Sequence, residues 1–164
     1  MNTTLVFIHA LDTRAILLGQ AEVDAPVLRL PMGAARAVLG FPSPAEDFEG
    51  DSVDLNELLV RNPPATFLYR AEGCSMIGAG ICDGDVLIVD RSVRPQGGDV
   101  VIAVWDGNAP VCKVLYIFKD HIELQSRNPS IASIVLPPDM EVEIFVVVGV
   151  ARRMRREHGR QSLT

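Results

Sequence analysis

Short apolar runs separated by turn-forming residues dominate the chain from Thr66 onward. Six of these runs have the length of β-strands and are bounded by Gly, Pro, Asn or Asp: residues 67–71, 86–89, 100–105, 111–118, 121–124 and 142–150. This pattern is typical of an all-β sheet or a partly open barrel. Asp106-Gly107-Asn108 predicts a hairpin between the third and fourth runs. We therefore predict a mainly β domain over residues 66–153, resembling neither a helical bundle nor a repeat array.

The segment ahead of Thr66 has a different pattern. Residues 1–39 mix short apolar runs with Gly and Pro and show no sustained helical or strand period, which predicts a flexible N-terminal arm that needs something else to pack on. Prolines in the stretch 40–45 favour an extended, exposed connector. Asp54 as a helix cap, an acid three positions later and clustered leucines predict one short helix that ends before Pro63. We thus divide the chain into an arm (1–39), a connector with a short helix (40–65), the β domain (66–153) and a basic tail (154–164).

Charge is distributed unevenly along the chain. The formal net charge is −6, yet the five arginines between 152 and 160 outnumber Glu157 and give that stretch +4, leaving −10 for residues 1–150. An acidic body predicts no direct sequence-specific binding of DNA, although the tail could contact phosphate or an acidic partner. A solvated chain end is the simpler interpretation of the tail.

Cysteine usage and hydropathy indicate the compartment. The longest apolar run, around 144–151, is too short to span a bilayer, and no basic region precedes the apolar N-terminal stretch. Cys74, Cys82 and Cys112 form neither an even disulfide set nor a CxxC metal pattern. We therefore predict a cytoplasmic protein with no membrane anchor.

Lys113 is the most unusual residue of the chain. The protein has two lysines against thirteen arginines, and Lys113 lies within the apolar run 111–118. Strand alternation places Val111, Lys113, Leu115 and Ile117 on one face, with Cys112, Val114, Tyr116 and Phe118 on the other. Both faces are apolar, so the amine has little access to water. Burial disfavours an ammonium, and a neutral amine can take a proton from a nearby hydroxyl, as in Ser-Lys dyads.

Ser75 is the candidate nucleophile for such a dyad. Gly73 and Gly78 flank it and ease tight backbone geometry, and the small side chains around it let the backbone amides of Cys74 and Ser75 face a developing oxyanion. A serine in a glycine-containing loop is seldom a nucleophile, however, and a strand lysine usually extends to the surface. Spacing alone therefore leaves the structural interpretation open.

Several segments, taken in order, resemble the LexA/UmuD-type family of self-cleaving Ser-Lys peptidases. They are residues 40–45, 53–59, 73–77, 80–90, 97–103, 111–115 and the asparagine-containing turn 125–129. The resemblance runs from about Leu39 to Arg153. It implies the fold of that family's β domain, with Ser75 as nucleophile, Lys113 as base and the bond Leu39–Gly40 in the chain's own arm as substrate. Members usually have Ala or Cys before the scissile glycine, so the larger Leu39 requires a roomier pocket or slows cleavage, by a factor of about 10 to 200.

The resemblance also implies partners. It implies cleavage stimulated by a RecA filament on single-stranded DNA during the SOS response to DNA damage, then a shortened homodimer that serves a UmuC-like Y-family polymerase in translesion synthesis. The main alternative is a non-cleaving dimerisation and polymerase-binding module. A LexA-like repressor would need a DNA-binding domain, which 39 residues without helical periodicity do not supply, and a signal peptidase would need a membrane anchor.

Other reactive residue types have simpler structural interpretations. We predict that Met76 packs in the core, that Cys74 and Cys82 are small buried residues, and that His121 lies in a turn. Three acids, Asp83, Asp85 and Asp90, alternate at a strand entrance without the ligand count of a calcium loop. We expect them to cap turns. The sequence predicts no metal and no cofactor.

Overall fold

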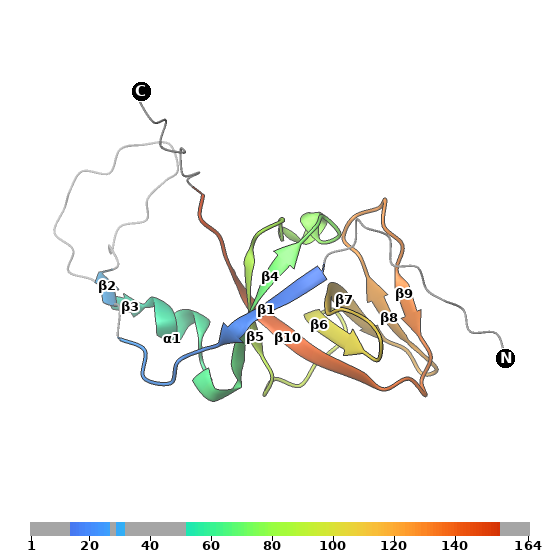
Figure 1. The fold of residues 1–164 in the computed structure, drawn as a ribbon, viewed down its shortest axis with the longest axis horizontal. Coiled ribbons are helices and arrows are strands. Elements are labelled where there is room, and N and C mark those ends of the chain that lie inside the picture. The colour runs from blue at the N-terminus through green and yellow to red at the C-terminus, as the bar shows by residue number, and fades with distance from the viewer. Residues whose placement is uncertain (1–13, 27–28, 32–51, 155–164) are drawn as a thin grey trace, which may run out of the picture.

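The computed structural model describes residues 14–26, 29–31 and 52–154. An eight-stranded antiparallel sheet forms the main body, with the strand order β1-β4-β5-β10-β6-β7-β8-β9 (Figure 1). The strands are β1 (Arg14–Gln20), β4 (Thr66–Glu72), β5 (Val86–Asp90), β6 (Val100–Trp105), β7 (Val111–Ile117), β8 (Ile122–Gln125), β9 (Ile134–Leu136) and β10 (Val142–Ala151). Because β1 also pairs with β7, through Arg14 and Val111, the sheet closes into a ring.

A small second sheet lies outside the ring. It pairs β2 (Arg29–Pro31) with β3 (Ser52–Asp54), and the short helix α1 (Leu55–Leu59) follows directly (Figure 1). The side chain of Asp54 accepts a hydrogen bond from the backbone N–H of Asn56 at 2.8 Å, which caps the helix as predicted. A single 3-10 turn at Pro63–Ala65 then leads into β4.

The predicted mainly β architecture is confirmed. All six predicted strands are present, with ends that differ from the expected ones by one residue at most, and β6 and β7 form the expected hairpin. Gly107 occupies the turn between them with φ of 74°, a backbone region that glycine adopts at little cost. α1 is the one α-helix among the described residues.

Strand β1 falls inside the segment for which the sequence predicts no strand. Ala15 is its one buried residue, whereas Ile16, Leu17 and Leu18 are 45%, 50% and 44% exposed. The pairing register with β4 also shifts between Leu17 and Gly19. Exposed apolar residues and a bulge together remove the alternation by which a strand is recognised. This part of the arm packs on β4.

Two hydrophobic clusters make up the core, and β7 contributes to both. Cys112 and Val114 belong to the first cluster, which includes Tyr69, Met76 and Leu87. Val111 and Leu115 belong to the second, which includes Val101, Trp105 and Leu124. The prediction that Lys113 lies among buried apolar residues on both faces of β7 is confirmed for residues 111–115, whereas Ile117 at the end of the strand is 57% exposed.

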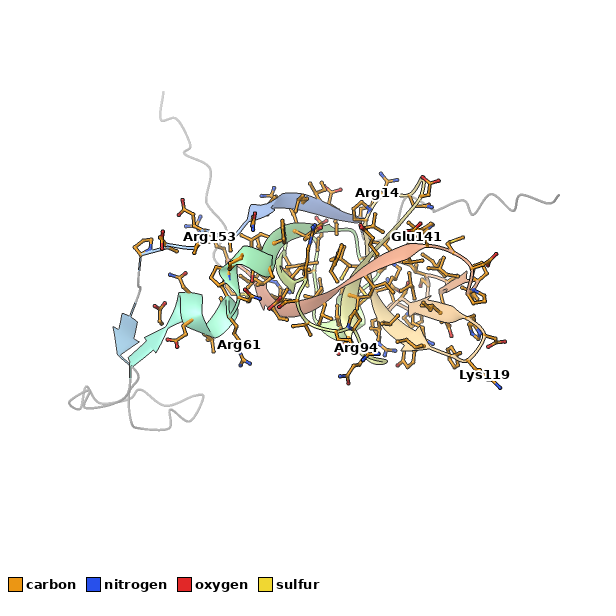
Figure 2. The ribbon with its side chains drawn as sticks, turned by 90° about the horizontal axis from the view of Figure 1, so that it is seen from below. Arg14, Arg61, Arg94, Lys119, Glu141 and Arg153 are labelled. Carbon is orange, nitrogen blue, oxygen red and sulfur yellow. The ribbon has the colours of Figure 1, made fainter. Side chains whose placement is uncertain are left out.

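Charged side chains lie mostly at the periphery of the fold. Arg61 and Arg94 extend away from the ribbon in Figure 2, and both are exposed. Lys119, the second lysine, is exposed as well. Among the described residues, no helix is both long and apolar enough to cross a membrane.

Candidate active site

Ser75 and Lys113 meet in the interior of the protein. Lys113 lies opposite Val101 in the β6–β7 pair, and Ser75 lies in the loop that follows β4. Lys113 Nζ donates a hydrogen bond to Ser75 Oγ at 2.8 Å, and both residues are fully buried. The fold thus brings together the two predicted catalytic side chains, which are 38 positions apart in the sequence.

Two backbone hydrogen bonds connect the loop that carries Ser75 to the segment after β8. The backbone carbonyl of Ser75 accepts a hydrogen bond from Arg127 N at 2.7 Å, and Gly78 N donates to the carbonyl of Arg127 at 2.8 Å. A Cβ atom at position 78 would collide with that same carbonyl oxygen. Glycine is therefore required at position 78, because only a residue without a side chain lets the two backbones approach this closely.

Asn128 orients the peptide group just ahead of Ser75. Its Nδ2 donates to the carbonyl oxygen of Cys74 at 3.1 Å, while its Oδ1 accepts from Ser130 N at 3.0 Å. A peptide unit is planar, so fixing the Cys74 carbonyl also fixes the direction of the Ser75 N–H. That N–H is one of the two predicted oxyanion donors. The roles of the Cys74 and Ser75 amides stay predictions.

A buried carboxylate anchors the far end of the nucleophile loop. Asp85 is buried and pairs with Arg152, whose Nη2 lies 2.6 Å from Oδ2, and it accepts from Cys82 N at 2.8 Å. The hydrogen bond from Arg152 holds the pKa of Asp85 below its usual value, although burial opposes this shift. Arg152 also donates to the carbonyl of Gly80 at 2.7 Å. The end of β10 is thereby connected to the loop that carries the nucleophile.

This contact corrects one expectation. The sequence interpretation counted Arg152 with a solvated basic chain end, but its side chain, which is 37% exposed, is held in an ion pair with the buried Asp85. Composition could not reveal this because the partner, Asp85, is 67 positions away. The two described residues beyond it, Arg153 and Met154, are exposed.

Of the other two acids, one caps a turn as expected and the other does not. Asp90 Oδ1 accepts from both the backbone N and the hydroxyl of Ser92, which caps the turn after β5. Asp83 Oδ1 accepts from Gly73 N at 2.8 Å, so this carboxylate joins the two ends of the nucleophile loop instead of capping its own turn. Within the described parts of the chain, no three His, Cys, Asp or Glu side chains gather closely enough to hold a metal ion.

The sulfur-containing residues are partly as predicted. Met76 is fully buried in the first core cluster, which confirms its packing role. Cys74 and Cys82 are half-buried rather than buried, so that prediction is wrong; both lie in the partly accessible loop between β4 and β5. Cys112 is fully buried, and burial raises the pKa of its thiol to about 12.

His121 lies in the β7–β8 connection, as expected for a turn residue. Its Nδ1 is 2.9 Å from Asp120 Oδ1, and its ring stacks on Phe118 with a centroid separation of 4.5 Å. The contact with His121 lowers the pKa of the Asp120 carboxyl. Nothing in these contacts connects His121 to the Ser-Lys pair.

The arrangement is suited to proton transfer between a hydroxyl and an amine. A neutral amine at hydrogen-bond distance from a serine Oγ can accept its proton as the oxygen attacks a carbonyl. The bond Leu39–Gly40 lies outside the described residues, so its position relative to Ser75 stays a prediction. Sequence reasoning missed the anchoring roles of Arg127, Asn128 and Arg152; Asn128 had a signal, because it lies in the turn 125–129 that carries part of the family resemblance.

The chain is similar to several known proteins. A family model described as Peptidase S24-like matches residues 31–150. The chain is 41% identical over 125 residues to Protein ImpA of Escherichia coli, covering 76% of this chain and 85% of ImpA. It is 38% identical over 120 residues to Protein MucA of Escherichia coli, covering 73% and 81%. It is 37% identical over 132 residues to the LexA repressor of Ruminiclostridium cellulolyticum, covering 80% of this chain and 57% of the repressor. The chain therefore belongs to the Peptidase S24-like family, as its resemblance to LexA/UmuD-type sequences led us to expect.

Proposed function

We propose that this chain is a serine endopeptidase that cleaves its own Leu39–Gly40 bond. The observation that carries the proposal is the 2.8 Å hydrogen bond between Lys113 Nζ and Ser75 Oγ, made where both side chains are shielded from water. Removal from water favours the neutral form of an amine, which is the form able to act as a base. Membership of a peptidase family agrees with this chemistry.

The reaction follows from the roles of the two side chains. The neutral amine of Lys113 takes the proton of Ser75 Oγ as this oxygen bonds to the carbonyl carbon of Leu39. The backbone amides of Cys74 and Ser75 stabilise the resulting oxyanion. Lys113 then gives the proton to the nitrogen of Gly40, the C–N bond breaks, and an ester to Ser75 remains. Water, deprotonated by Lys113, hydrolyses the ester and restores the serine.

The reaction needs a control, because an attached substrate has a high effective concentration. We propose that a minor conformer presents Leu39–Gly40 to the dyad, and that a RecA filament on single-stranded DNA binds this conformer more tightly and raises its population. Cleavage would leave residues 40–164. As a homodimer, this product would serve a UmuC-like Y-family polymerase in translesion synthesis during the SOS response.

A reducing compartment suits the structure. All three cysteines, Cys74, Cys82 and Cys112, are free thiols, as is usual for cytoplasmic proteins. We therefore propose that the protein acts in the cytoplasm.

The test is to identify the product. Purified protein is incubated with RecA filaments on single-stranded DNA, and mass spectrometry determines where the chain is cut. We expect one new fragment that begins at Gly40, with Ser75→Ala and Lys113→Ala remaining intact. A cut at another bond would contradict the site assignment. An intact wild-type chain would favour the non-cleaving polymerase-binding module, for which the bulk of Leu39 is the specific argument.

A further inference from the structure

Two strand pairs connect the parts of the chain on either side of the proposed cleavage point. β1 and β2 precede Leu39–Gly40 in the sequence, whereas their partners β4 and β3 follow it. β1 pairs with β4 from Arg14↔Glu72 to Gln20↔Phe67, and β2 pairs with β3 along its three residues. Breaking one peptide bond between these elements leaves both pairings in place.

Further hydrogen bonds also cross the cleavage point. Two lie at the ends of β1: Ala21 N donates to Thr66 O, and Ala15 N donates to Pro110 O, each at 2.9 Å. Two come from side-chain amides: Gln20 Nε2 donates to Pro64 O at 2.6 Å, and Asn56 Nδ2 donates to Pro26 O at 2.9 Å. The segment before residue 39 is thus bonded to β4, to the start of β7 and to α1.

Ala15 anchors the N-terminal arm, residues 1–39, which we call the leader, to the core. It is buried in the first core cluster and lies opposite Ala71, which is also fully buried. A small residue is favoured here, because a larger side chain would have to displace the packed core around Ala15. The next three residues are about half exposed, so Ala15 is the point at which the strand enters the interior.

Loss of β1 would also open the ring. β1 lies between β4 and the first residue of β7, Val111, and Figure 1 shows it crossing the middle of the fold beside β4. Without it, the backbone edge of β4 would have unpaired N–H and C=O groups. Such an edge binds an extended segment by main-chain hydrogen bonds, with selectivity from alternate side chains.

We propose that the body carries a strand-binding surface, made of the β4 edge and the carbonyl of Pro110, and that the leader stays bound there through residues 14–20 after cleavage. The proposal rests on the proposed function for the cut itself. It identifies the occupant as an extended segment of this same chain with a small residue at the position of Ala15. Cleavage then produces a nicked, two-piece protein, and departure of residues 1–39 is a separate step that a competing partner can drive.

The test separates leader retention from the chemistry of the dyad. In the full chain carrying Ser75→Ala, residues around 39–40 are replaced by the recognition sequence of an added site-specific protease, so the cut does not depend on Lys113. After cutting, native mass spectrometry and size-exclusion chromatography report the composition. We expect the two pieces to travel together as one complex that separates in denaturant. Immediate appearance of the free leader would overturn the proposal.

A matched pair of substitutions tests the docking site. Ala15→Asp places a charge in the core, whereas Leu17→Asp places the same charge at a position of the same strand that is 50% exposed. After the cut, we expect Ala15→Asp to speed leader release by about tenfold or more, with Leu17→Asp near the unaltered rate. Equal release rates would overturn the proposal.

A peptide-exchange experiment tests the same contact without the risk that a substituted chain misfolds. A labelled peptide of residues 12–22 is added to the unaltered nicked protein, so that only the peptide carries a substitution. We expect the native peptide to replace the bound leader slowly, and the Ala15→Asp peptide to bind at least about tenfold more weakly. Equal binding of the two peptides, or of neither, would overturn the assignment of the surface.

Discussion

Arg152→Met is expected to destabilise the protein in a pH-dependent way, because Arg152 neutralises the buried Asp85. Removing one member of a buried ion pair typically costs about 3 to 5 kcal/mol, since the other charge is left uncompensated. Arg152 is 37% exposed, so water screens part of the interaction and we expect the cost at pH 7 to lie below that range. Methionine keeps most of the side-chain length, which limits the loss of packing.

The sign of the pH effect follows from Asp85. Arg152 lowers the pKa of Asp85 in the folded state, so the folded protein holds this carboxylate ionised more strongly than the unfolded chain does. The stabilisation is fully present above the unfolded value of about 4 and is lost as pH falls from there through the lower folded-state pKa. The cost of Arg152→Met should therefore shrink below about pH 4.

Urea unfolding in a Ser75→Ala background measures both effects without interference from self-cleavage. The control is Arg94→Met, which removes an exposed arginine (Figure 2) and should change the free energy of unfolding by less than about 0.5 kcal/mol. The reasoning fails if Arg152→Met lowers the free energy of unfolding by no more than Arg94→Met does. It also fails if Arg152→Met lowers this free energy equally at pH 3 and at pH 7.

Three further predictions concern the nucleophile loop and the core. Gly78→Ala should destabilise the protein by about 1 to 3 kcal/mol in urea unfolding, because its Cβ meets the carbonyl of Arg127, whereas Gly97→Ala has open space and should not; equal effects would contradict the close approach. Asn128→Ala should lower the self-cleavage rate about tenfold or more while leaving the shape of the pH–rate profile unchanged, since Asn128 positions a peptide group and does not titrate; an unchanged rate would refute that role. Burial raises the thiol pKa of Cys112 to about 12, so Cys112 should resist alkylation at pH 8 until the protein unfolds. Rapid labelling of the native protein would show that the thiol is accessible in the folded state.

Much of the sheet could be predicted because most of its strands have a clear local pattern of apolar residues bounded by turn residues. β6 and β7 are continuous apolar runs joined by a turn sequence, and burial of Lys113 follows from the apolar residues on both sides of it. The approach of Ser75 to Lys113 did not follow from spacing. It was predicted from several ordered motifs of one family, since no local signal connects residues in different elements.

The remaining features depend on tertiary contacts. β1 has exposed apolar residues at three successive positions and a register shift between Leu17 and Gly19, so its pattern resembles that of a loop. β9 has three residues, too few to establish a period. Arg152 looks like part of a basic tail until the fold brings it to Asp85. For β1 and Arg152, the partner that explains the feature is remote in the sequence.

The pH–rate profile of self-cleavage tests the Ser75–Lys113 dyad most directly. Purified wild-type, Ser75→Ala and Lys113→Arg chains are incubated between pH 7 and pH 10.5, and the fragment beginning at Gly40 is quantified by mass spectrometry. We predict a wild-type rate that rises with pH, because only an unprotonated base can take the proton of Ser75 Oγ. Both variants should stay intact, because a guanidinium remains protonated over this range and cannot act as the base. Cleavage of Lys113→Arg at the wild-type rate, or a wild-type rate that does not vary with pH, would contradict the account.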